Sequence, residues 1–217
     1  GIDMDGILTS RDILDLNELP ASLAIIGGGI IGMEFAFIYS NYGVDVKVLE
    51  YLEDVLPGVD KDISSEIRSI AKRDRIDITT QAQVKEVKKN EEGYVVKYLK
   101  DSESKEIIAE KVLVATGREP SFGGLDLDSL GIETENNAIK VDDYLKTSVD
   151  NIYAIGDVTG KILLAHVASH QGVVAVENIL GKEKKMDYDA VPSAIFTSPE
   201  IATVGLSEEE VKQRDID

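Results

Sequence analysis

The sequence has no cysteine and no tryptophan, and only two of its 217 residues are histidine. Without cysteine, these residues contain no disulfide, no thiol nucleophile and no thiolate metal site. No apolar run reaches the ~20 residues that a membrane-spanning helix requires. The 23 basic residues are outnumbered by 41 acidic ones, and the net charge of −18 makes a nucleic-acid or anionic-membrane partner unfavourable.

The remaining composition, with 43% hydrophobic and 29% charged residues, is that of a globular protein. The length allows one large domain or about one and a half domains of typical size. The first residue is glycine, and a capping box at Ser207 and Glu210 starts a helix with only a few residues left to follow. We therefore expect the chain to be a piece of a longer protein.

The most informative stretch is residues 23–50, which read LAIIGGGIIGMEFAFIYSNYGVDVKVLE. A short apolar run of strand length leads into Gly27, Gly29 and Gly32, which have G-x-G-x-x-G spacing. A mostly apolar segment of helix length follows at 30–42, and a second strand-like segment then ends at Glu50. This order of strand, glycine-rich turn, helix and strand is typical of a dinucleotide-binding unit.

Each of these glycines has a steric role in such a unit. Gly27 allows the tight turn, Gly29 lets a pyrophosphate approach the backbone, and Gly32 lets the helix pack closely on the sheet. The free N–H groups at the helix start attract phosphates, with a dipole contribution of roughly 0.3–2 kcal/mol. A glycine-rich turn that binds nothing is the competing interpretation, and the surrounding strands, helix and acid disfavour it.

Glu50 lies 18 positions after Gly32, about where an acidic residue reaches the ribose of a dinucleotide. Its carboxylate accepts hydrogen bonds from ribose hydroxyls, but it would repel a 2′-phosphate by about 1 kcal/mol in water and about 4 kcal/mol at an effective dielectric of 20. Residues 51–53 supply no cation to offset this repulsion. The sequence therefore predicts NAD rather than NADP, and an ordinary solvated strand-end acid is the alternative interpretation of Glu50.

The other periodic segments predict an α/β fold with a Rossmann-like parallel sheet, in which an antiparallel β-meander replaces one crossover helix. A domain boundary is expected near Asp187. Helices are expected at 60–73 and 165–180, the meander strands at 84–88, 94–99 and 106–109, and further strands at 74–79, 111–115, 138–141, 152–155, 195–196 and 203–204.

A second strand-like segment ends in an acid at Gly156-Asp157. In open α/β sheets the carboxyl ends of strands meet ligands. The helix expected after this point would direct its N-terminal N–H groups toward an anionic or electron-accepting ring. On the sequence pattern alone, a turn or cap residue is an equally good interpretation of Asp157.

Six segments resemble the flavoprotein disulfide reductases (class I pyridine nucleotide-disulfide oxidoreductases), and most closely the dihydrolipoamide dehydrogenases. They keep that family's order and cover nearly the whole chain: GGGIIGMEFA (27–36), VLE (48–50), ATGREP (115–120), YAIGDVTG (153–160), LLAHVASHQG (163–172) and FTSPEIATVGLSE (196–208). The resemblance implies an NAD-binding domain at 11–120 and parts of an FAD-binding domain at 1–10 and 121–187. Residues 188–217 would be the truncated start of an α+β dimerisation domain.

The resemblance also implies which residues contact each cofactor. Glu34 matches a glutamate that pairs with a lysine beside the flavin, so it would support catalysis near the nicotinamide. The implied NAD-binding residues are Gly27, Gly28, Gly29, Ile30, Ile31, Gly32, Glu34, Glu50, Val84 and Gly117. The implied FAD-binding residues are Arg118, Gly156, Asp157, Leu163, Leu164, Ala165 and His166.

Three features of that family are missing from these residues: the first GxGxxG, the redox Cys-x4-Cys pair and the C-terminal His-Glu pair. We therefore expect no catalytic residue within this portion, and no activity from it alone. His166 and His170 have the spacing of a zinc pair. No Glu follows His166 and no third ligand is evident, so no metal site is predicted.

For the parent protein, the resemblance implies oxidation of dihydrolipoamide through a disulfide and FAD, with hydride transfer to NAD. It implies a cytoplasmic homodimer that serves the lipoyl domains of 2-oxo-acid dehydrogenase or glycine-cleavage complexes. Two alternatives stay open: an NADH oxidase or coenzyme A-disulfide reductase of the same fold, or a non-catalytic NAD-binding module. For this portion itself, we expect NAD to bind and FAD to bind weakly or not at all.

Overall fold

The computed structural model describes residues 3–216, which form two compact units. The first unit runs to Gly117 and resumes at Ala194, and the second comprises Arg118–Ser193. Each unit has its own buried apolar clusters. Within the described residues, no helix is both long enough and apolar enough to cross a membrane.

The first unit is built on a five-stranded parallel sheet with the strand order β1-β8-β2-β3-β4. An antiparallel meander of β5, β6 and β7 replaces the helix between β4 and β8. The predicted α/β fold with a parallel sheet and a meander crossover is therefore confirmed. The elements are β1 (Ile7–Leu8), a 3-10 helix (Asp12–Asp15), β2 (Ser22–Ile26), α1 (Ile30–Asn41), β3 (Asp45–Leu49), α2 (Lys61–Arg73), β4 (Ile76–Thr79), β5 (Gln83–Asn90), β6 (Gly93–Lys100), β7 (Glu103–Ala109) and β8 (Lys111–Val114), followed after the second unit by β11 (Ser193–Ile195), β12 (Ile201–Thr203) and α5 (Glu208–Gln213).

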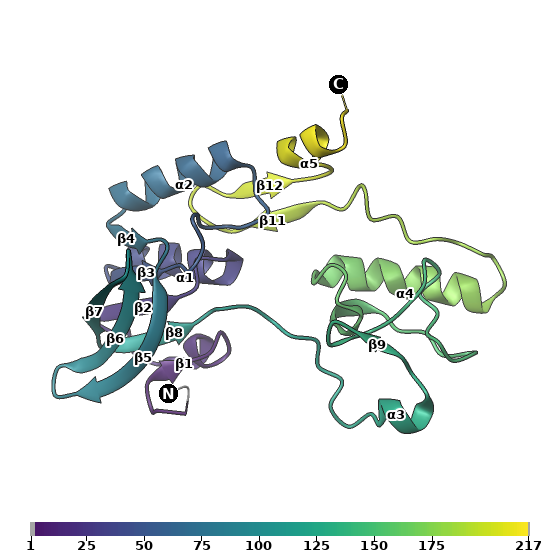
Figure 1. The fold of residues 1–217 in the computed structure, drawn as a ribbon, viewed down its shortest axis with the longest axis horizontal. Helices are drawn as coiled ribbons and strands as arrows, with labels where there is room; N and C mark the ends of the chain where they lie inside the picture. Colours follow the sequence, from purple (N-terminus) through teal and green to yellow (C-terminus); the bar gives the residue numbers. More distant parts are fainter. Residues whose placement is uncertain (1–2, 217) are drawn as a thin grey trace. The chain divides into compact units, whose positions relative to one another are not determined.

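Both faces of the parallel sheet are covered, one by α1 and α2 and the other by the meander (Figure 1). Successive residues of a strand point to opposite faces. Leu23 and Ile25 of β2 accordingly join the cluster beneath the helices, while Ala24 joins the cluster beneath the meander. Burial on both faces explains why β2 reads as a continuous apolar run, as is usual for parallel strands.

Helix α1 carries Phe37, the largest fully buried side chain of the described residues, which is 2% exposed. Met33 and Ala36 are buried beside it in the same cluster. The helix ends where the sequence predicts, because Gly43 follows the cap residue Tyr42 with a φ of +85°. Glycine adopts this left-handed conformation without the steric cost that other residues carry.

The second unit has little regular strand structure. Its elements are α3 (Leu127–Leu130), β9 (Thr134–Glu135), β10 (Ala138–Ile139), a 3-10 helix (Gly156–Thr159) and α4 (Ala165–Ile179). The helix predicted at 165–180 is confirmed as α4, which buries Val167 and Val174 against Leu145 and Met186. Gly181, with a φ of +82°, follows its last residues.

The strand predicted at residues 152–155 is wrong. Tyr153 forms one isolated bridge with Lys146, and Ala154 donates its N–H to the Leu145 carbonyl at 3.1 Å. The apolar side chains are still used, since Ala154 and Ile152 pack into a small cluster. An apolar run indicates burial, but a strand also needs a neighbour along its whole length, and within residues 3–216 this segment has only a short one.

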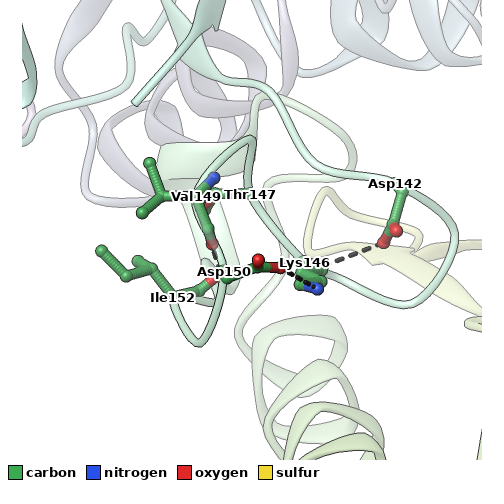
Figure 2. Close-up of polar contacts among 6 residues, drawn as sticks. All are labelled: Asp142, Lys146, Thr147, Val149, Asp150 and Ile152. Atoms are coloured by element: carbon green, nitrogen blue, oxygen red, sulfur yellow. Dashed lines mark hydrogen bonds and ion pairs between the residues drawn. The ribbon is translucent and has the colours of Figure 1, made fainter. Parts of the chain in front are cut away.

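A polar turn brings residues 145–147 beside 152–154 (Figure 2). The Asp142 carboxylate accepts a hydrogen bond from the Lys146 N–H at 2.9 Å, and the Thr147 hydroxyl donates to the Ile152 carbonyl at 3.0 Å. The Lys146 ammonium group lies 2.7 Å from Asp150, and this hydrogen bond lowers the pKa of Asp150. Local polar contacts therefore fix a segment that has no continuous strand partner.

Replacing Phe37 by alanine tests the helix-side core of the first unit. We expect a loss of about 3–5 kcal/mol in the free energy of unfolding, because the side chain leaves a cavity beneath α1. Urea unfolding followed by circular dichroism measures the effect. The neighbouring Ile38→Ala is the control, since Ile38 is 43% exposed. Similar losses in the two variants would contradict the assignment of Phe37 to the core.

Candidate functional site

The carboxyl ends of β2, β3 and β8 meet at one edge of the parallel sheet, where open α/β sheets bind ligands. The glycine-rich turn follows β2, Glu50 follows β3, and Gly117 lies just beyond β8. The Gly27 N–H donates to the Leu49 carbonyl at 2.9 Å, and the Ala115 N–H donates to the Ile26 carbonyl at 2.8 Å. The structure thus brings three of the predicted NAD-binding segments together.

The glycines of the turn differ in what surrounds them. Gly27 has a φ of +109°, and a Cβ there would overlap the Ala115 carbonyl oxygen. A Cβ on Gly32 would overlap the Gly27 carbonyl oxygen. Gly29 has an ordinary φ of −72°, and a Cβ there would meet nothing within 4 Å. Close packing against the chain itself explains why Gly27 and Gly32 lack a side chain. Gly29 faces open space, so packing does not explain the glycine there.

The start of α1 offers backbone donors to that space. Gly29 is the N-cap residue and no side chain caps the helix. The Met33 N–H makes the first intrahelical bond, to the Gly29 carbonyl at 2.9 Å. The preceding N–H groups of Ile30, Ile31 and Gly32 have no partner within the helix. Donors in this arrangement bind phosphate groups.

Glu50 has a structural role that the sequence did not predict. Its side chain is only 6% exposed, and its carboxylate accepts hydrogen bonds from the N–H of Gly28 and, at 2.7 Å, from the N–H of Leu52. A carboxylate has about four acceptor positions, so about two remain for ribose hydroxyls. Glu50 therefore fixes the glycine turn against the end of β3 and still has capacity for a ligand.

The loop after β3 folds back over the turn, which the sequence also did not predict. The Leu56 N–H donates to the Gly28 carbonyl at 2.8 Å. Leu56 is fully buried and has a φ of +54°, an uncommon conformation for a residue with a side chain. A Cβ on Gly28 would come within 2.8 Å of the Val55 side chain. The sequence signal that could have revealed this contact is the pair of adjacent apolar residues, Val55 and Leu56, inside a polar loop.

The remaining predicted NAD residues lie around this edge. Val84 is half-buried in β5, whose start is held near Glu50 by a bond from the Ala82 N–H to the Glu50 carbonyl at 2.8 Å. Gly117 has a φ of +134° and open space at its Cα. Glu34, on α1, accepts a hydrogen bond from the Phe196 N–H at 2.8 Å. Glu34 therefore connects α1 to the segment between β11 and β12.

The second unit contains the predicted FAD-binding residues. Arg118 and Asp157, which come from separate motifs, form an ion pair with a 2.9 Å separation between Nη2 and Oδ2. Both side chains are substantially exposed, so the pair contributes little to stability. Gly156, beside Asp157, has a φ of +76° and packs against Ala168 of α4. The structure thus places the acid of this motif and the arginine on one surface.

The start of α4 also lacks a side-chain cap. Leu164 is the cap residue and its own N–H bonds to the Ile162 carbonyl at 3.0 Å, while Leu163, Ala165 and His166 are exposed. The Nε2 atom of His166 lies 2.9 Å from the Pro192 carbonyl, so this nitrogen carries the proton and donates. Among residues 3–216, no three His, Asp or Glu side chains form a group that could hold a metal ion.

Gln171 positions the Gly156 turn and was missed by the sequence analysis. It is fully buried on α4. Its Oε1 accepts a hydrogen bond from the Gly156 N–H at 2.6 Å, and its Nε2 donates to the Tyr188 hydroxyl at 2.9 Å. Buried polar groups need such partners. An amide on the apolar face of a helix was the signal that could have identified it.

Replacing Glu50 by glutamine tests its role in holding the turn. One of the two backbone donors would face an amide NH2 group, and we expect a local cost of about 1–3 kcal/mol. Hydrogen exchange at the Gly28 and Leu52 amides should then be faster by about ten- to a hundredfold. Glu53→Gln, on the exposed part of the same loop, is the matched control. Unchanged exchange in Glu50→Gln would contradict this role.

Replacing Gln171 by leucine keeps the side-chain size but removes the acceptor for the Gly156 N–H. An unsatisfied buried donor costs about 1–3 kcal/mol, so we expect the Gly156 amide to exchange at least about fivefold faster. His170→Ala, on the exposed neighbouring residue, should leave that rate unchanged. Equal rates in the two variants would show that Gln171 does not hold the turn.

Comparison with known proteins agrees with these features. The family model for pyridine nucleotide-disulphide oxidoreductases matches residues 2–172. Two relatives named dihydrolipoyl dehydrogenase are 44% identical over 211 residues (Chlamydia pneumoniae) and 42% identical over 217 residues (Bacillus subtilis strain 168). These matches cover 97% and 98% of this chain but only 45% and 46% of the relatives. The chain thus spans about half the length of the curated relatives it matches.

Solved structures give the same result. One is the HOCl-induced flavoprotein disulfide reductase RclA from Escherichia coli, in a Cu(II) complex, with a TM-score of 0.88 and 31% sequence identity. The match covers 98% of this chain and 48% of the RclA chain. LpdA from Mycobacterium tuberculosis has a TM-score of 0.88 at 32% identity and covers 97% of this chain and 46% of its own. The resemblance found in the sequence is confirmed: the chain belongs to the pyridine nucleotide-disulphide oxidoreductase family.

Proposed function

We propose that the first unit binds NAD at the carboxyl edge of its parallel sheet. The observation that carries this proposal is the open space at Gly29, beside uncapped helix donors and next to the buried carboxylate of Glu50. The pyrophosphate would bind to the N–H groups that precede the first bond of α1. The adenine ribose would bind to the acceptor positions of Glu50 that the backbone leaves free.

The same geometry supports a preference for NAD over NADP. Glu50 is held in place by two backbone donors, so its carboxylate would not easily move away from a 2′-phosphate. Tyr51, Leu52 and Glu53 bring no cation to this position. Val84 and Gly117, which flank the edge, would contact the adenine and the later part of the dinucleotide.

For the whole protein we propose a dihydrolipoyl dehydrogenase, as the relatives from Chlamydia pneumoniae and Bacillus subtilis are named. It would be a cytoplasmic homodimer that oxidises dihydrolipoamide on lipoyl domains. FAD, when bound, would supply the electron relay between a disulfide and the nicotinamide. In the second unit, Arg118, Gly156, Asp157 and residues 163–166 would contact the flavin cofactor. Residues 1–10 and 121–187 would contribute to the FAD-binding domain, 11–120 to the NAD-binding domain, and 188–217 to a dimerisation domain.

The 217 residues contain no cysteine, so this portion would not catalyse disulfide chemistry alone. A second candidate for the whole protein is a flavoprotein disulfide reductase that acts on another disulfide. The TM-score of 0.88 to RclA, which is named a flavoprotein disulfide reductase, supports this second candidate. The higher identity to the dihydrolipoyl dehydrogenases favours the first candidate.

Replacing Gly29 by aspartate tests NAD binding without disturbing the fold. A Cβ at Gly29 meets nothing, and aspartate is a favoured helix N-cap, so thermal stability should be kept or increased. The new carboxylate would face the pyrophosphate and repel it by about 1–4 kcal/mol per charge pair. We therefore expect NADH affinity, measured by fluorescence titration, to fall at least about tenfold.

Gly29→Ser is the matched control, because it adds a side chain and a helix cap without a charge. It should weaken NADH binding less than Gly29→Asp. The unmodified chain should also bind NADH at least about tenfold more tightly than NADPH, since Glu50 repels the additional phosphate. Equal NADH affinity in the aspartate variant and the unmodified chain would remove the proposal.

A further inference from the structure

A second feature of the first unit is a positively charged hollow on an acidic chain. The hollow has a volume of about 660 Å3 and lies between the second half of α2 and the start of β4. Arg68, Lys72 and Arg75 line it, against the single carboxylate of Asp77. The whole chain carries a net charge of −18, so this local excess of cations differs from its general character. We call this hollow the α2 groove.

The helical repeat explains why these side chains share one face. Residues three or four apart lie next to each other on a helix, and Ser65, Arg68, Ser69 and Lys72 follow this spacing. Arg75 extends the row just past the end of α2. Arg68 and Lys72, both within α2, are separated by about 6 Å along the axis, and Arg75 lines the same hollow. A short ligand can therefore reach all three cations at once.

Two of the three cations that line the groove form no ion pair within residues 3–216, and the third pairs with one carboxylate. Arg68 lies 3.3 Å from Asp54, with both side chains partly exposed. Within residues 3–216, Lys72 and Arg75 form no ion pair with the chain, whereas the neighbouring Arg73 faces Glu66 at 3.9 Å. The hollow thus presents two cations without protein partners and the remaining donors of a third.

Arg75, the third cation of the groove, lies just past the end of α2 in a left-handed backbone conformation. Arg75 has a φ of +62° and directly follows Asp74, the C-cap residue of α2. The corresponding positions after α1 and α4 are Gly43 and Gly181, because glycine adopts a positive φ without steric cost. The position after the cap of α5 is Asp215, also with a positive φ. Arginine therefore occupies a conformation that is uncommon for residues with a side chain, and its side chain lines the groove.

We propose that the α2 groove binds a small anion that carries two or three phosphate groups. Guanidinium groups bind phosphate oxygens in pairs, and Lys adds a compact charge. The hydroxyls of Ser65 and Ser69 add further polar groups to the lining. Ile76 is the first residue of β4, so the groove lies at the amino end of that parallel strand, away from the carboxyl edge proposed for NAD. The proposal is therefore independent of NAD binding.

Calorimetric titration of the 217-residue chain with sodium tripolyphosphate, in EDTA, tests this site. Arg75→Gly and Lys72→Gln should each weaken binding by about tenfold, equivalent to about 1.4 kcal/mol. Arg75→Gly should at the same time raise the melting temperature, because glycine suits the backbone conformation better. Arg73→Gln, on α2 but outside the lining, is the matched control and should change the affinity by less than about twofold.

Adenosine triphosphate, titrated under the same conditions, distinguishes the source of the phosphates. Binding at least as tight as that of tripolyphosphate supports a nucleotide ligand, and weaker binding supports a free polyphosphate. Backbone amide shifts in nuclear magnetic resonance spectra should be concentrated at residues 65–78.

Any one of four results would overturn the proposal. Affinity unchanged in both groove variants, or shifts confined to residues 27–32, would place the anion at the glycine turn. Tighter binding of a hexaglutamate peptide than of tripolyphosphate would assign the groove to an acidic protein segment. A lower melting temperature for Arg75→Gly, together with unchanged affinity for tripolyphosphate, would show that Arg75 stabilises the negative end of the α2 dipole and does not bind a ligand.

Discussion

A buried carboxylate bonded to backbone amides is the interaction on which the binding edge of the first unit depends. Glu50 leaves the end of β3 and accepts hydrogen bonds from Gly28 in the turn after β2 and from Leu52 in the loop that follows. Burial strengthens these bonds and makes their loss costly. The turn, the strand end and the folded-back loop are thus fixed relative to one another before any ligand binds. A preorganised site spends less of its binding energy on ordering the protein.

In the second unit, too, a buried side-chain oxygen accepts a hydrogen bond from a glycine N–H, but here the side chain is a glutamine. Gln171 lies fully buried on α4, and its amide oxygen holds the N–H of Gly156 where an apolar segment turns into a 3-10 helix. In both units a distant polar side chain satisfies a glycine N–H that regular secondary structure leaves free. The glycine allows the turn, and the acceptor selects one conformation of it.

The two faces of the parallel sheet are covered by different elements. The helices α1 and α2 cover one face, and the meander covers the other. The start of α1 is thereby placed at the carboxyl edge with its donors exposed, while its apolar side, centred on Phe37, remains in the core. Glu34 on the same helix accepts from the Phe196 N–H. One helix thus joins the proposed nucleotide site, the core and the segment after β11.

The sequence alone determined the α/β class, the glycine-rich turn, α1, α2, α4 and the meander, because periods of 2 and 3.6 and the positions of glycine are local properties. It also placed Glu50 and Asp157 at segment ends. The tertiary structure alone decided the long-range bonds of these residues, since the Glu50–Gly28, Gln171–Gly156 and Glu34–Phe196 bonds join residues 22, 15 and 162 positions apart. It also decided that residues 152–155 are not a strand. An apolar pattern specifies burial, whereas a hydrogen-bond partner is fixed only when packing brings distant groups together.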